Sequence, residues 1–182
     1  MPSDIVKVSK FLSLVLRHKP EEIGLTLDEH GWAEVEQLLR LANHRRHRLT
    51  RPLLERVVVE NDKQRFAFSD DGQRIRANQG HSVAVDLALA PSEPPTVLYH
   101  GTAARFVASI RVTGLHAGTR QQVHLSRNMA TATTVGQRHG TPDVLLVHAR
   151  EMSAAGHQFF LSANGVWLTE RVPVAFIRFP GA

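Results

Sequence analysis

The sequence contains no cysteine, which excludes disulfide bridges, thiolate metal ligands and a cysteine nucleophile. No apolar run approaches the roughly 20 residues needed to cross a bilayer, and the first residues lack a signal-peptide core. There is also no GxGxxG segment, no Walker loop and no internal repeat, so any dinucleotide must bind without a Rossmann crevice. These absences predict a soluble, cytoplasmic protein with no membrane partner.

Positive charge exceeds negative charge in the 182 residues. Lys and Arg number 22 and Asp and Glu number 17, which gives a formal charge of +5 and an isoelectric point near 10.4. The excess favours polyanionic partners, nucleic acid above all, although charge alone does not separate RNA, DNA and a dinucleotide.

The first half of the chain combines helical periodicity with a hairpin signal. Apolar residues repeat at helical spacing from Ser3 or Asp4 to Pro20, again after Gly31, and again after Thr50. The segments KQRFAF and QRIRA flank the turn signal SDDG, which predicts a hairpin. Three helices followed by a two-stranded wing are typical of a winged-helix lobe, a fold that often binds nucleic acid.

The proline-rich stretch LAPSEPPT, from Leu89 to Thr96, marks the predicted boundary between two lobes, residues 1–90 and 91–182. Beyond it, only the segments around 103–112 and 129–136 have a helical pattern. Short β-like runs predict an antiparallel lobe, and with it an α+β fold class. These runs are TVLYH, QQVHLS, DVLLVHA, HQFFLS, GVWLT and VAFIRF.

Eleven histidines raise the possibility of a metal site. His44 and His47 are close in sequence, but Arg45, Arg46 and Arg48 beside them oppose a divalent cation, and no HExxH or neighbouring carboxylate is present. We therefore expect no metal, and interpret NHRRHR as a solvated basic connection that could touch a nucleic-acid backbone.

Three arginines stand at positions suited to binding an anion. Arg17 ends the first predicted helix, Arg65 begins the wing, and Arg138 lies between two glycines in VGQRHG. A guanidinium meets two phosphate oxygens at once, which favours a phosphate ligand. Each arginine also has a simpler interpretation: a cation near the helix C-terminus is mildly stabilising, and arginine is usually exposed. Likewise, YHGT at Tyr99 to Thr102 is either a ligand-binding corner or an ordinary strand end.

Taken together, the ordered segments LRHKP, HGW, KQRF, QGHS, YHGT, VHLS, VGQRHG and NGVWLTERVP resemble the RNA 2'-phosphotransferase family, also called tRNA 2'-phosphotransferase, from about Val8 to about Phe179. The resemblance implies a winged-helix RNA lobe joined to an ADP-ribosyltransferase-like lobe. It further implies a metal-free transferase reaction that consumes NAD+ and removes an internal 2'-phosphate from RNA, as in tRNA splicing. An RNA-2'-phospho-ADP-ribose intermediate would form, and the products would be nicotinamide, RNA with a 2'-hydroxyl, and ADP-ribose 1'',2''-cyclic phosphate.

The resemblance also assigns site residues. Four residues match the family's catalytic quartet: Arg17, His18, Arg65 and Arg138. Lys63 would add a secondary positive charge at the RNA phosphate. His18 would move protons in the second step. A cation at a helix end adds at most about 1 kcal/mol of stability, whereas loss of a preorganised transition-state donor costs about 10²- to 10³-fold in rate, so Arg17→Ala should hardly alter melting but nearly abolish turnover.

For NAD+, the resemblance assigns His100, Gly101 and Thr102 to the nicotinamide riboside and its ribose. It assigns His124 with Ser126 to the second position of the ADP-ribosyltransferase triad. The third position of this triad is glutamate in many protein-modifying relatives, whereas here it is Val166. An apolar residue suits the reaction, because the RNA phosphate is already an anion that a carboxylate would repel. Asn164 and Gly165 either shape this NAD-binding loop or only form a tight turn.

Two other functions remain compatible with these residues. One is an ADP-ribosyltransferase that caps terminal phosphates of nucleic acid and stops after the first step. The other is a non-catalytic winged-helix regulator that senses NAD+. For any of these functions we expect a monomer.

Overall fold

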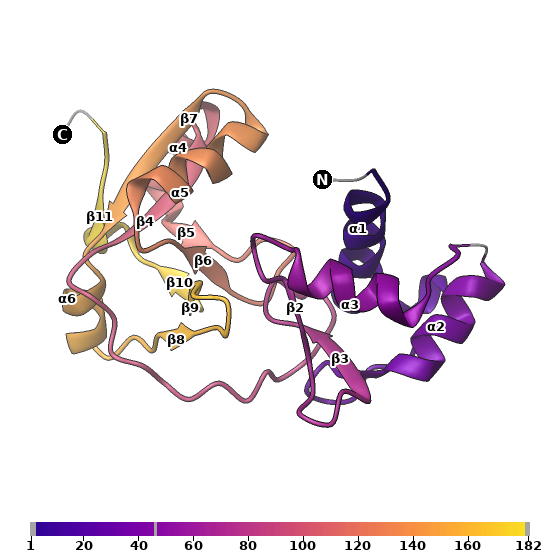
Figure 1. Cartoon of the computed structure of the whole chain (residues 1–182). Helices are drawn as coiled ribbons and strands as arrows, with labels where there is room; N and C mark the ends of the chain where they lie inside the picture. Colours follow the sequence, from indigo (N-terminus) through magenta and orange to yellow (C-terminus); the bar gives the residue numbers. More distant parts are fainter. Residues whose placement is uncertain (1–2, 46, 181–182) are drawn as a thin grey trace. The chain divides into compact units, whose positions relative to one another are not determined.

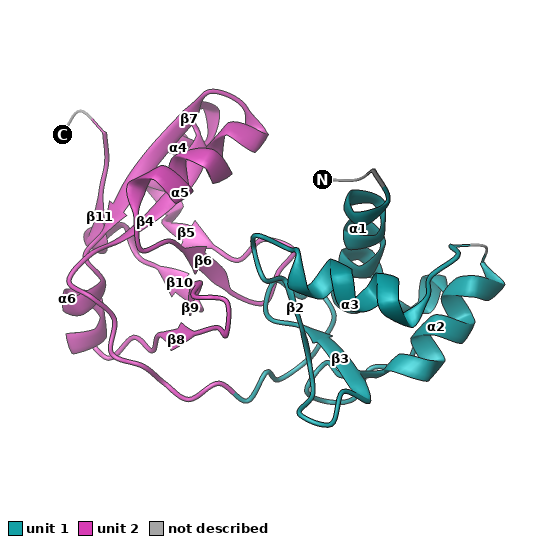
Figure 2. Ribbon diagram, viewed as in Figure 1, with its two compact units in different colours: residues 1–88 teal, residues 89–182 magenta. Residues whose placement is uncertain are grey.

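The chain has two compact units, Met1–Ala88 and Leu89–Ala182, in a computed structural model that describes residues 3–45 and 47–180 (Figure 2). The division falls at the start of LAPSEPPT. Each unit has its own apolar core and combines α-helices with small antiparallel sheets, which confirms the predicted α+β class.

The N-terminal unit combines three α-helices with a small antiparallel sheet among its described residues (Figure 1). Its elements are α1 (Ser3–Arg17), the 3₁₀ turn η1 (Pro20–Glu22), β1 (Ala33–Glu34), α2 (Val35–His44), α3 (Arg51–Val59), β2 (Phe66–Phe68) and β3 (Arg74–Ala77). The sheet order is β1-β3-β2, with Ile75 opposite Ala33 on one side and Phe68 on the other. The predicted hairpin is confirmed as β2 and β3, and β1 adds a third strand that the sequence analysis did not predict.

Periodicity correctly located the helices of this unit. The apolar face of α1, including Leu12, Val15 and Leu16, is fully buried in the core. Thr50 caps α3, since its side-chain oxygen accepts a hydrogen bond from the Leu53 amide at 3.4 Å. Pro20 follows the end of α1 and cannot continue the helix.

The C-terminal unit is built mainly of short strands. Its elements are β4 (Leu98–Ala103), α4 (Ala104–Thr113), β5 (Leu115–His116), β6 (Val123–Leu125), α5 (Met129–Gly136), η2 (Gln137–His139), β7 (Pro142–Val147), α6 (Ala149–Ala154), β8 (Phe160–Leu161), β9 (Trp167–Thr169), β10 (Arg171–Val172), η3 (Val174–Phe176) and β11 (Ile177–Arg178). They form the sheets β11-β7-β4, β6-β9-β8 and β10-β5, all antiparallel.

The strand pattern of this unit agrees with the sequence except at short elements. Each predicted run contains a strand, but DVLLVHA leaves its strand after Val147 and enters the unpredicted helix α6. The helix contributes only six residues, too few to establish a helical period. The pair β5 and β10 was also missed, because each strand has two residues and is defined by its distant partner.

Candidate functional site

The C-terminal end of α1 is held by the segment that follows β3. The amides of Ser82 and Val83 donate to the Arg17 carbonyl oxygen at 2.9 and 3.3 Å. The Arg17 side chain is only 9% exposed; its Nη2 donates to the Arg65 carbonyl oxygen at 3.4 Å, and its Cζ lies 5.9 Å from the Phe66 ring centre. Arg17 is therefore not the exposed arginine of the simpler interpretation, and its truncation should reduce stability as well as turnover, which corrects the expectation that melting hardly changes.

His18 lies beside Arg17 but is exposed, and Ser82 contacts both residues. The His18 Nδ1 is 3.0 Å from the Ser82 Oγ, which is itself 3.5 Å from the Arg17 carbonyl oxygen. A hydroxyl can donate to Nδ1 or accept from it, so this contact suits either neutral tautomer of the ring. The sequence offered QGHS as a motif but gave Ser82 no role.

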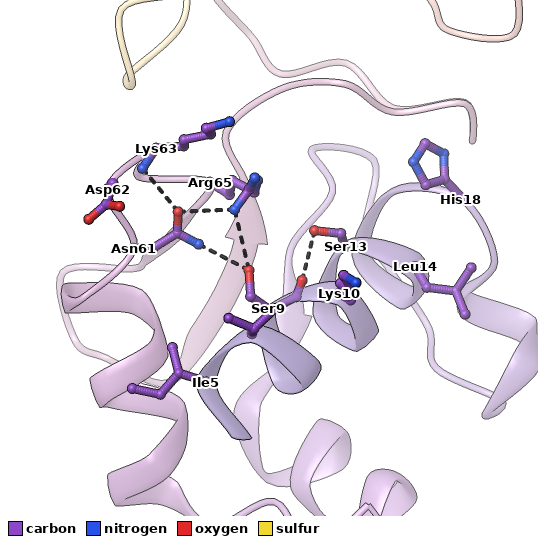
Figure 3. A pocket seen from close by; sticks show the side chains of 11 residues that line it. Ile5, Ser9, Lys10, Ser13, Leu14, His18, Asn61, Asp62, Lys63 and Arg65 are labelled. Carbon is purple, nitrogen blue, oxygen red and sulfur yellow. Dashed lines mark hydrogen bonds between the residues drawn. The ribbon is translucent and has the colours of Figure 1, made fainter. Parts of the chain in front are cut away.

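His18, Lys63 and Arg65 line one pocket of about 480 Å³ in the N-terminal unit (Figure 3). The Arg65 Nη1 donates to the Asn61 Oδ1 at 3.3 Å and lies 3.5 Å from the Ser9 Oγ. Asn61 is buried and donates to the same Ser9 oxygen at 3.1 Å, so Arg65 is held by groups that are themselves fixed. Three predicted phosphate-binding or catalytic residues thus share a cavity.

His81 is a buried titratable group next to this region. It is 2% exposed, and neither ring nitrogen has a hydrogen-bond partner among residues 3–45 and 47–180. Burial, followed by the positive charges of Arg17, His18 and Arg76, lowers the pKa of His81 to about 4. The ring is therefore neutral at pH 7, which makes its burial tolerable.

The buried His81 predicts a loss of stability in mild acid. The unfolded chain, in which the histidine pKa is near 6.5, binds more protons than the folded chain between pH 6.5 and pH 4. The contribution of His81 to the free energy of unfolding is thus fully present above pH 6.5 and declines as the pH falls from 6.5 to 4. We expect the free energy of unfolding to decrease by about 2 kcal/mol from pH 7 to pH 5 on this account.

Urea denaturation of the wild-type chain and of His81→Leu at both pH values measures this contribution. The variant should lose about 2 kcal/mol less than the wild type over the same interval. Equal losses in the two proteins would show that His81 is not the group responsible.

In the C-terminal unit, β4 and β6 bring two of the predicted NAD+ residues, His100 and His124, into contact. Tyr99 and Ser126 exchange main-chain hydrogen bonds of 2.9 and 2.8 Å. The His100 Nδ1 lies 3.1 Å from the His124 carbonyl oxygen, and because a carbonyl can only accept, His100 carries a proton on Nδ1. Burial is the main cause that lowers the pKa of His100, which favours a neutral ring whose Nε2 is an acceptor.

Gly101 and Gly136 let β4 and α5 pack backbone to backbone. A Cβ atom on Gly101 would overlap the Ala132 carbonyl oxygen, and one on Gly136 would lie 2.6 Å from the Thr102 carbonyl oxygen. This packing gives Gly101 a structural role that the sequence did not reveal. The strand also continues through buried Thr102 to Ala103, so YHGT lies within β4 rather than at its end.

Arg138 lies in η2, directly after α5, with an exposed side chain. Sequence reasoning missed a second arginine, Arg120, whose Nη1 donates to the His124 Nδ1 at 2.6 Å. Partial loss of hydration, and then the positive charge of Arg138, lowers the pKa of the Arg120 guanidinium. Arg120 could have been found from the sequence because it immediately precedes the segment QQVHLS.

The segment from Ser162 to Val166 forms a closed turn before β9. The Ser162 amide donates to the Val166 carbonyl at 3.0 Å, and the Gly165 amide donates to the Ser162 carbonyl at 2.9 Å. The Ser162 hydroxyl donates to the Asn164 Oδ1 at 2.8 Å, and Gly165 has a φ of 76°, which favours glycine. The tight-turn interpretation is confirmed, while contacts of Asn164 and Val166 with NAD+ stay a prediction.

A family model described as RNA 2'-phosphotransferase, Tpt1 / KptA family, matches residues 3–171. The chain belongs to this family. Relatives named "Probable RNA 2'-phosphotransferase" include one from Pseudomonas aeruginosa PAO1, 60% identical over 171 residues that cover 93% of this chain and 94% of the relative. Others come from Acaryochloris marina, 52% identical with 97% of both chains covered, and Streptomyces griseus, 54% identical with 97% of both covered.

In this RNA 2'-phosphotransferase family member, the basic run NHRRHR has a packing role at one position. The His47 ring stacks on Phe11 with 3.9 Å between ring centres, whereas Arg46 lies outside the described residues. None of the helices in the described part of the chain is long and apolar enough to span a bilayer.

Proposed function

We propose that the chain removes an internal 2'-phosphate from RNA and transfers it to NAD+. The observation that carries this proposal is the extent of the family match, because residues 3–171 include both the Arg65 pocket and the His100 strand. Removal of the phosphate left by tRNA splicing is the role that the family's reaction suits best.

The N-terminal unit is proposed to bind the RNA phosphate. Its element order, α1-β1-α2-α3-β2-β3, and its sheet order, β1-β3-β2, support a winged-helix lobe. A phosphodianion needs charge compensation, and Arg17, Lys63 and Arg65 supply cationic groups. Asn61 and Ser9 hold the Arg65 fork before any ligand arrives, so little reorganisation is needed on binding.

The C-terminal unit is proposed to bind NAD+ as an ADP-ribosyltransferase-like lobe. A neutral His100, with Nδ1–H bonded to the His124 carbonyl, offers its Nε2 as an acceptor to a ribose hydroxyl or to the nicotinamide amide. Apolar Val166 leaves this region without the carboxylate that would repel an incoming phosphate.

The proposed reaction has two steps. A 2'-phosphate oxygen first forms a bond to the anomeric carbon of the nicotinamide riboside, and the bond to nicotinamide breaks. The ribose 2''-hydroxyl then attacks phosphorus, the RNA 2'-oxygen leaves, and ADP-ribose 1'',2''-cyclic phosphate forms. His18 takes the hydroxyl proton and returns a proton to the leaving oxygen, while Arg138 stabilises the phosphoryl charge in both steps.

Product analysis tests the proposal against its rivals. The chain is incubated with NAD+ and either an RNA with one internal 2'-phosphate or the same RNA with only a terminal phosphate. We expect nicotinamide, 2'-hydroxyl RNA and the cyclic phosphate from the first substrate. ADP-ribose that stays attached to a terminal phosphate, with no cyclic product, would identify a capping enzyme. Absence of nicotinamide release from both RNAs would favour the regulator.

A further inference from the structure

A second pocket of about 480 Å³ in the N-terminal unit is lined by α1, by α3 and by residues 47–49, which precede α3; we call it the α1–α3 groove. Its wall is partly apolar, with contributions from Val8, Leu49 and Leu53. None of the proposed catalytic or NAD+-binding residues, all of which lie within the described ranges, lines this groove. It therefore has no part in the chemistry proposed above.

Positive charge predominates at the α1–α3 groove. Lys7, Arg48 and Arg56 line it, and Asp4 is the only carboxylate among its lining residues in the described part of the chain. One further carboxylate is near, because the Glu60 Oε1 lies 3.1 Å from the Arg56 Nε. Cations still outnumber carboxylates, which favours an anionic ligand.

An aromatic pair lies beside these cations in the same groove. The exposed His47 ring stacks on Phe11, with the two ring planes inclined by 24°. Because Phe11 occupies one face of the ring and His47 is exposed, the ring offers a flat surface on which a nucleobase can stack. Cations that meet phosphates, next to a ring that stacks on bases, are the two parts of a site for single-stranded nucleic acid.

The backbone on both sides of Arg48 is held by hydrogen bonds. The His47 amide donates to the Ala42 carbonyl oxygen at 3.0 Å, and the Asn43 side-chain amide donates to the Leu49 carbonyl oxygen at 2.8 Å. Arg48 has a φ of 47°, a left-handed conformation that non-glycine residues rarely adopt. Residues persist in such a conformation only where their surroundings hold them, and they are concentrated at binding sites. The exposed Arg48 side chain is thus presented from a fixed backbone.

We infer that the α1–α3 groove binds a stretch of the substrate RNA that flanks the phosphorylated nucleotide, with one base stacked on His47 and backbone phosphates on Lys7 and Arg48. The inference rests on the proposed function, which makes RNA the substrate. Ile5 lines both this groove and the pocket of Arg65, so the two cavities adjoin the same segment of α1 and one strand can reach both. Stacking and phosphate contacts do not read base edges, so the groove adds affinity without sequence preference.

RNA length tests the inference without relying on turnover. Fluorescence anisotropy, without NAD+, compares two single-stranded RNAs with one internal 2'-phosphate: a trinucleotide and an RNA of about 12 nucleotides. His47→Ala should weaken binding of the longer RNA by about 10-fold, the usual effect of losing one stacked base, and alter binding of the trinucleotide by less than about twofold. His47→Phe keeps a flat ring and should restore the affinity.

Arg48→Gly provides a second variant that removes the charge and suits the φ of 47°, so it should stay folded. A plot of log affinity against log salt for the longer RNA should become less steep by about 0.7, which corresponds to one phosphate contact on a single strand. Arg40→Ala removes an exposed arginine of α2 that does not line the groove. This matched control should bind both RNAs normally.

The longer RNA without its 2'-phosphate separates this inference from the proposed function. It should bind the wild type more weakly, yet lose the same factor in His47→Ala. If it does, and no phosphate is transferred from the phosphorylated RNA, the proposed function fails and the groove stands. Wild-type affinity of a folded His47→Ala for the longer RNA would overturn the inference, as would equal losses for both RNA lengths. Polyglutamate that displaces the unphosphorylated RNA at equal concentration would also overturn it, and would assign the groove to an acidic protein segment.

Discussion

Arg65→Ala should lower turnover of an RNA with an internal 2'-phosphate by about 10²- to 10³-fold, the typical cost of losing one preorganised transition-state donor. The reason lies in how the side chain is held. Asn61 and Ser9 bind its Nη1, and the guanidinium lines the pocket that also contains His18 and Lys63 (Figure 3). Single-turnover assays with saturating NAD+ would measure the loss.

The stability of this variant should change much less than its activity. Arg65 is half-buried, and its neighbours Asn61 and Ser9 remain bonded to each other after truncation. Arg56→Ala removes an exposed arginine of α3 that pairs with Glu60, and serves as a control with near-normal turnover. A folded Arg65→Ala with wild-type turnover would remove Arg65 from the proposed chemistry.

Gly101→Ala should destabilise the C-terminal unit by at least about 3 kcal/mol, at the upper end of the cost of overpacking. The added methyl group would overlap the Ala132 carbonyl oxygen, which belongs to the backbone of α5 and cannot move aside as a side chain can. Strand β4 and helix α5 would have to separate, and β4 is the strand that carries His100 and Thr102.

Thermal and urea unfolding would measure this loss. Gly156→Ala is a suitable control, because a Cβ atom there meets nothing within 4 Å and only its φ of 95° opposes the substitution. It should cost about 1 kcal/mol. Similar stabilities for Gly101→Ala and Gly156→Ala would show that close packing at Gly101 is not essential.

Long periodic segments were the part of the fold that the sequence predicted well. The apolar face of α1 and the capped start of α3 are local features, so a single stretch of chain specifies them. In contrast, β1, β5 and β10 have two residues each and exist because a distant strand supplies hydrogen bonds. Such pairing depends on tertiary packing, which propensity and periodicity do not contain.

The site was predicted as a set of residue types, without the groups that hold them. Arg65 was identified by resemblance, yet Ser9 and Asn61 lie 56 and 4 residues away and had no visible link to it. Arg17 was assigned from the resemblance, with an exposed helix-end cation as the simpler alternative, and its contacts with Phe66 and Arg65 were not foreseen. The combined action of Arg17, Arg65 and Arg138 on one phosphate stays a prediction.

The most direct test of the central claim follows the phosphorus atom itself. An RNA with a radiolabelled internal 2'-phosphate is mixed with the chain and NAD+, and the products are separated over time. The account predicts that the label passes through an RNA-linked ADP-ribose species and ends in ADP-ribose 1'',2''-cyclic phosphate, with one nicotinamide released per label transferred. Label that leaves as inorganic phosphate, or that remains on the RNA while NAD+ is consumed, would contradict it.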